Sequence, residues 1–182
     1  MDLGLAGRVA LVAGSSGGLG LATALRLAQE GAHVAVNGRD TARCEAAAAA
    51  VRAAAPAVSV LACPADVARP AAAATLVQQV VGHFGRLDIL VCNAGGPPPT
   101  TFATAAADAF QQGLDLNLLS TIHLCRAAVP AMRKRRWGRI VCITSIAAKQ
   151  PLPTSSSPRW PGLGSTASPR PSPTSWAGTA SW

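Results

Sequence analysis

The sequence lacks several features that define whole classes of protein. It has no tyrosine, no CxxC pair among its five cysteines and no clustered histidines, so we expect neither a metal site nor a disulfide framework. No apolar run approaches the ~20 residues of a membrane-spanning helix. Residues 1–18 show no basic head or cleavable apolar segment, so we expect no signal peptide and a cytoplasmic location. We therefore expect neither a membrane protein nor a secreted disulfide-rich domain.

Acidic residues are also scarce: eight Asp and Glu face sixteen Lys and Arg, for a net charge of +8. Half of this excess lies in residues 133–136, the run RKRR. Basic side chains are common at the C-terminal end of a helix, where they complement the exposed carbonyl groups. Since no nucleic-acid motif accompanies the run, we favour this interpretation over a phosphate-binding patch and expect no nucleic-acid partner.

The composition divides the chain into an organised part and a tail. With 182 residues, 49% of them apolar, and a mean hydropathy of +0.29, the chain can bury one sizeable core. From residue 151 onward there are seven Pro and eight Ser but no acidic residue and no period. We therefore expect one domain over residues 1–153 and an irregular, disordered tail over residues 154–182.

Short apolar runs alternate with helical patterns along residues 1–153. Strands are predicted at residues 8–13, 33–36, 58–62, 87–92 and 139–143, and helices at residues 18–29, 41–54, 71–84 and 106–136. This alternation is typical of an α/β fold with a doubly wound parallel sheet. The runs LDILVC and RIVCI are apolar on both faces, so both strands are expected to be covered by helices on each side.

The segment AGSSGGLG, residues 13–20, stands between the first predicted strand and the first predicted helix. Glycines there permit a tight turn and let backbone N–H groups approach a pyrophosphate at the positive end of the helix. Further polar segments follow the next strands: residues 37–39, Asp66 and residues 93–95. Open α/β sheets bind ligands at these carboxyl ends, so the pattern predicts a dinucleotide site.

The end of the second predicted strand bears on the choice of cofactor. NAD-binding sites place an acidic residue there to accept hydrogen bonds from the ribose hydroxyls. Here Asn37, Gly38 and Arg39 occupy the place, and a guanidinium can pair with a 2′-phosphate. We therefore favour NADP over NAD, although Arg39 as an ordinary surface charge is the open alternative.

On these residues the chain resembles the short-chain dehydrogenase/reductase family. Gly14-x-x-x-Gly18-x-Gly20 is similar to the family's Thr-Gly-x-x-x-Gly-x-Gly loop, with Ala13 in place of Thr, and HFGRLDILVCNAG is similar to its Asn-Ala-Gly region. The resemblance implies strand order 3-2-1-4-5 with later strands missing, and hydride transfer with a small-molecule carbonyl or alcohol. For a chain in which the family's missing segment is restored, it implies a homo-oligomer formed through the helix at residues 106–136. It also implies that Ser145 and Asn117 are catalytic residues. The expected cofactor-binding residues are Gly14, Ser15, Ser16, Gly18, Leu19, Gly20, Asn37, Arg39, Asp66, Val67, Asn93, Ala94 and Gly95.

The resemblance also implies a Tyr and a Lys beyond the serine, and the chain has no tyrosine. Lys149 is too close to Ser145 to take the Lys role. One permitted codon choice for residues 154–182, read two bases later, gives an amphipathic helical pattern similar to the family's segment, with Ser and Arg in the Tyr and Lys positions. We interpret the tail as the product of a frameshift. The alternative to an active oxidoreductase is a catalytically inactive nucleotide-binding remnant or interaction module.

Overall fold

The computed structural model describes residues 3–95, 106 and 108–144. Its centre is a parallel sheet of five strands in the order β3-β2-β1-β4-β5, which confirms the expected topology. The strands are β1 (Val9–Val12), β2 (His33–Gly38), β3 (Val60–Pro64), β4 (Ile89–Cys92) and β5 (Arg139–Cys142). After β3 the chain passes β2 and β1 and forms β4 on the other side of β1. The loops that follow β1 and β4 therefore lead away from each other, and this place is the topological switch point of the sheet.

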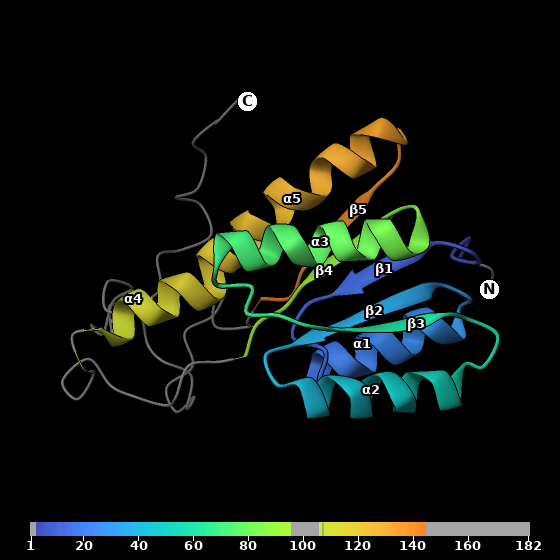
Figure 1. Ribbon diagram of the computed structural model, residues 1–182, viewed down its shortest axis with the longest axis horizontal. Coiled ribbons are helices and arrows are strands. Elements are labelled where there is room, and N and C mark those ends of the chain that lie inside the picture. The colour runs from blue at the N-terminus through green and yellow to red at the C-terminus, as the bar shows by residue number, and fades with distance from the viewer. Residues whose placement is uncertain (1–2, 96–105, 107, 145–182) are drawn as a thin grey trace, which may run out of the picture.

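Helices cover both faces of this sheet (Figure 1). They are α1 (Gly18–Gln29), α2 (Thr41–Ala54), α3 (Pro70–Phe84), α4 (Ala109–Leu114), the π-helical segment η1 (Asp115–Leu119) and α5 (Ser120–Lys134). One apolar core lies between the sheet and α1 with α2, and a second between the sheet and α3 with α5. No helix in the described ranges is both long enough and apolar enough to cross a bilayer.

The bounds of most elements differ from the expected ones by one or two residues, and the largest differences are at β2, at β3 and in the last helical region. β2 continues through Asn37 and Gly38, because the Asn37 side chain donates to the carbonyls of Cys63 on β3 and of Ala65 just after it. β3 accordingly begins two residues later than predicted and ends at Pro64. The single helix expected over residues 106–136 is interrupted by η1.

The last strand contradicts one expectation. β4 is fully buried, as predicted, but all four residues of β5 are exposed, with Ile140 at 39% and Val141 at 52%. The prediction that helices cover both faces of β5 is therefore wrong for the described part of the chain. The reason is position: within these residues β5 pairs only with β4 and forms an edge of the sheet.

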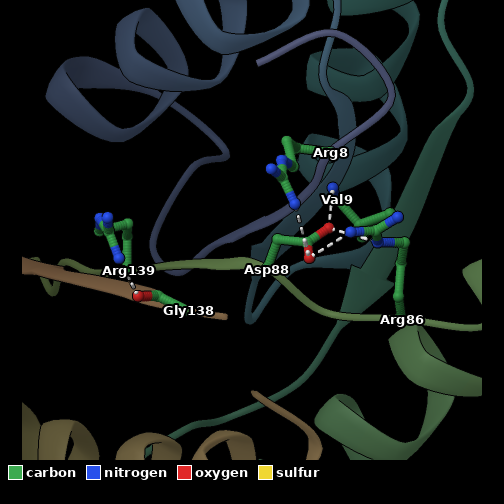
Figure 2. A network of polar contacts seen from close by, with 6 residues as sticks. All are labelled: Arg8, Val9, Arg86, Asp88, Gly138 and Arg139. Atoms are coloured by element: carbon green, nitrogen blue, oxygen red, sulfur yellow. Dashed lines mark hydrogen bonds and ion pairs between the residues drawn. The ribbon is translucent and has the colours of Figure 1, made fainter. Parts of the chain in front are cut away.

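A buried carboxylate joins the amino ends of β1 and β4 (Figure 2). Asp88 accepts a hydrogen bond from the Val9 backbone N–H at 2.9 Å and two from Arg86, at 2.6 and 2.7 Å. The Arg8 guanidinium lies 3.9 Å from the same carboxylate and also stacks over the Trp137 ring. This network holds the edge of the sheet opposite the predicted ligand site.

Candidate dinucleotide site

The loop between β1 and α1 has a backbone that glycine alone adopts without strain. Gly14 and Gly18 have φ values of +57° and +56°, in the left-handed region. A Cβ on Gly14 would lie 2.8 Å from the backbone oxygen of Asn93. The glycines thus let the loop lie directly against the end of β4.

Asn93 fixes this approach. Its side-chain amide donates to the carbonyl of Gly14 at 3.0 Å and to that of Ala13 at 3.4 Å. A Cβ on Gly20 would collide with the same Gly14 carbonyl, so the first turn of α1 also lies against the loop. The loop, the start of α1 and the end of β4 are therefore one packed unit.

Two of the predicted site residues, Ser15 and Asn37, have side chains that turn inward. Both are buried, and the Ser15 hydroxyl donates to the Val12 carbonyl at 2.6 Å and accepts from the Asn37 N–H at 2.9 Å. Asn37 donates its own amide to the carbonyl of Cys63 on β3 and to that of Ala65 just after the strand. These side chains hold the ends of β1, β2 and β3 together rather than reaching solvent.

The N-terminus of α1 is left open for an anion. Its first turn contains no acidic residue, and no side chain caps it. Gly18 and Leu19 are exposed there, Leu19 at 69%. The positive end of the helix dipole and its free N–H groups therefore face solvent beside the glycine loop, an arrangement that suits a phosphate.

Two cations lie at the neighbouring end of β2. Arg39 is exposed and, within the described residues, has no hydrogen-bond or ion-pair partner. The guanidinium of Arg43 lies 3.5 Å from the position a Cβ of Gly17 would take, so it reaches the glycine loop from α2. Asp40, which follows Arg39, accepts from the Arg43 N–H at 2.8 Å and caps α2.

Arg43 was missed in the sequence because its distance from the loop is set by the packing of α2 against α1. The signal that could have found it is its place in the first turn of a helix that starts immediately after β2. The side chain of Ser16 also lies here, since a Cβ on Gly38 would meet its hydroxyl at 2.7 Å.

The remaining predicted residues fall in different places. Asp66 accepts from the Ala68 N–H at 3.2 Å and pairs with Arg69 at 3.7 Å, while Val67 is buried in the core. Asn117 lies on η1, is exposed, and donates its amide to the Gly113 carbonyl at 3.0 Å. Ser145 lies outside the described residues, which end at Thr144.

The glycine loop, the end of β2 and the end of β4 with Asn93, Ala94 and Gly95 thus share the carboxyl edge of the sheet. Across residues 3–95, 106 and 108–144, no group of three His, Cys, Asp or Glu side chains is placed to hold a metal ion. A parallel doubly wound sheet with a glycine loop at its switch point defines the class of dinucleotide-binding α/β domains.

Within that class, the chain belongs to the short-chain dehydrogenase family. The family model for short chain dehydrogenase matches residues 8–157. Cyclohexanol dehydrogenase of Rhodococcus sp. (strain TK6) is 38% identical over 160 residues, covering 79% of this chain and 58% of the relative.

Two solved structures of nicotinamide-bound enzymes are similar to this chain. L-sorbose reductase from Gluconobacter frateurii, complexed with NADPH and L-sorbose, has a TM-score of 0.79 and 40% identity over 84% of this chain and 57% of its own. NAD⁺-bound xylitol dehydrogenase has a TM-score of 0.76 and 34% identity over 80% and 56%. The chain therefore spans between half and two thirds of the length of these relatives.

Proposed function

We propose that the chain binds NADP(H) and derives from an oxidoreductase that moves hydride between the nicotinamide and a small carbonyl or alcohol. The observation that carries the cofactor choice is the pair Arg39 and Arg43 beside the glycine loop. Asp40, the carboxylate next to Arg39 in the sequence, already uses one oxygen to cap α2. Two guanidinium groups suit a 2′-phosphate, which NAD lacks.

The residues present fit such a cofactor. The open N-terminus of α1 and the loop N–H groups would receive the pyrophosphate, and the close approaches at Gly14 and Gly20 leave no room for side chains in the loop. Asp66, half exposed at the end of β3, would contact the adenine. The loop at residues 93–95 would border the nicotinamide.

The chemistry that a bound nicotinamide supplies is hydride transfer at its C4 carbon. Ser145 would donate a hydrogen bond to the substrate carbonyl oxygen, and Asn117 would support a proton relay through water or backbone. In the described structure the Asn117 amide is held by the Gly113 carbonyl, so this role requires its oxygen or a bound water.

A second candidate follows from one observation: the 182 residues include no tyrosine to donate the proton. In that case the chain binds the nucleotide without turnover. Assay of a carbonyl panel with NADPH separates the two. We expect reduction at background level, and turnover abolished by Ser145→Ala would instead establish the oxidoreductase.

The cofactor proposal is tested by titration of NADPH and NADH, followed by cofactor fluorescence. NADPH should bind more tightly, and each of Arg39→Ala and Arg43→Ala should weaken NADPH by roughly 10-fold or more while sparing NADH, since a charge-assisted hydrogen bond contributes about 1.5–3 kcal/mol. Arg135→Ala removes the same charge at the far end of α5 and serves as the control. Equal affinities for the two cofactors in the unsubstituted chain would overturn the assignment.

The frameshift hypothesis belongs to this proposal. The family match stops at residue 157, close to the start of the segment whose shifted frame resembles the family. Sequencing the gene again across codons 150–185 tests the hypothesis directly. An unshifted reading identical to the printed sequence, in independent isolates, would show that the tail is encoded as written.

We further propose that the restored protein is a homo-oligomer. Leu114, Leu118 and Ile122 follow one another at intervals of four residues along α4, η1 and α5 and are 36%, 52% and 40% exposed. Such a stripe lies on one face of a helix and is suited to a partner helix. Light scattering of the frame-restored protein and of its Leu118→Glu variant tests this, the variant being expected to dissociate.

A further inference from the structure

Three of the five cysteines, far apart in the sequence, meet in the fold. Cys92 ends β4 and is paired in register with Cys142 on β5, so both side chains lie on the same face of the sheet. Cys125 on α5 packs against the core cluster that contains Cys92. Cys92 therefore has Cys142 beside it on the neighbouring strand and Cys125 beside it on the covering helix. All three are free cysteines.

The three thiols differ in their access to solvent. Cys92 is buried, Cys125 is half-buried and Cys142 is exposed. Cys142 is exposed although it lies in the apolar run RIVCI, for the same reason that the rest of β5 is exposed. Burial, reinforced by the two neighbouring cysteines, raises the pKa of Cys92 well above the usual range of a thiol. A reagent in solution therefore reaches Cys142 first, and Cys92 is the buried residue paired with it on the neighbouring strand.

We propose that Cys142 and Cys92 form a peroxide-sensitive dithiol site, in which Cys142 is oxidised first and Cys92 closes the disulfide. The Cys142 thiolate attacks one oxygen of a hydroperoxide, the O–O bond breaks, and Cys142 becomes a sulfenic acid while water or an alcohol leaves. The Cys92 sulfur then attacks the Cys142 sulfur, the S–O bond breaks, and the thiol proton departs with hydroxide as water. In total two thiols lose two electrons and two protons to the peroxide.

The strand pairing permits this bond. Neighbouring strands lie about 4.7–4.9 Å apart, and disulfides join Cα atoms about 4.4–6.8 Å apart. β5 is held by β4 alone among the described residues, so its end can adjust to bring the sulfurs together.

A disulfide between Cys92 and Cys142 would lie next to the candidate dinucleotide site. Cys92 immediately precedes Asn93, whose amide holds the glycine loop, and Cys142 lies three residues before Ser145. A disulfide would fix the ends of β4 and β5 to each other immediately before the Asn93 segment. The proposal concerns the thiols alone and stands whether or not the chain binds a dinucleotide.

The test is titration of the full chain with one equivalent of hydrogen peroxide, followed by thiol counting and non-reducing peptide mapping. Five free thiols should fall to three, and a phosphine reductant should restore them. Trypsin leaves Cys92 and Cys125 together in the peptide 87–126 and Cys142 in the peptide 140–149. The expected product is a cross-link between these two peptides in monomeric protein.

Single variants assign the bond. Cys125→Ser should keep the cross-link, and Cys142→Ser should keep all four of its remaining thiols after peroxide. Cys44→Ser, which removes a buried thiol on α2, is the control and should still lose two thiols after peroxide. Cys92→Ser should leave a sulfenic acid on Cys142 that dimedone traps. Five thiols after peroxide, a loop within peptide 87–126, or a cross-link confined to dimers would each overturn the proposal, and these readings need no variant to fold.

Discussion

Replacing Asp88 by alanine should remove the link between the amino ends of β1 and β4. The carboxylate is fully buried and receives three short hydrogen bonds, two from Arg86 and one from the Val9 N–H (Figure 2). Without it the buried Val9 N–H has no acceptor, which costs about 1–3 kcal/mol. Arg86 loses two charge-assisted bonds, but its side chain is 26% exposed and water partly replaces them, so we count about 2 kcal/mol. The free energy of unfolding should fall by about 3–5 kcal/mol, a large share of the stability of a domain this size.

The conservative variant Asp88→Asn makes this reasoning specific. It keeps an oxygen for the Val9 N–H and loses mainly the charge, so it should cost about half as much as Asp88→Ala. Urea denaturation followed by far-ultraviolet circular dichroism measures both, and Arg69→Ala, which removes an exposed ion pair with Asp66, is the control and should change stability by less than about 1 kcal/mol. A loss below 1 kcal/mol for Asp88→Ala, or equal losses for the two variants, would refute the account.

Two further predictions concern the thiols and the sheet edge. Burial raises the pKa of Cys63 to about 12, so the folded chain keeps a proton that the unfolded chain loses near pH 8.5. The contribution of the protonated Cys63 thiol to stability is complete below pH 8.5 and declines up to about pH 12. In urea titrations at pH 9–11, Cys63→Ala should therefore make the fall of the unfolding free energy with pH less steep by about 1.4 kcal/mol per pH unit. An unchanged slope would contradict the burial argument. Val141→Lys should raise the soluble fraction after expression, because a charge on an exposed edge strand opposes pairing between chains. Leu3→Lys, at a similarly exposed site outside the sheet, is the control. Equal gains in solubility for the two variants would exclude pairing at the sheet edge.

The local order of elements could be predicted because it depends on short-range patterns. The helix at Thr41–Ala54 has the predicted bounds, since an Asp cap before it and a Pro after it are local signals. The glycine loop was identifiable for the same reason, because its unusual φ values require glycine at fixed spacing. The strand order 3-2-1-4-5 came from resemblance to a family, as no local pattern specifies which strands are neighbours.

The tertiary structure decided what depends on contacts between distant segments. β2 extends to Gly38 because Asn37 finds carbonyls on β3, and the pattern HVAVNG contains no sign of that bond. Arg43 reaches the glycine loop, and Cys92 lies beside Cys125 and Cys142, only because helices and strands pack in this order. Hydrophobic periodicity reports which face of an element is buried, whereas the partner on that face is set by packing. The sequence by itself therefore determined the elements and the phosphate loop, and the fold determined which side chains stand beside that loop.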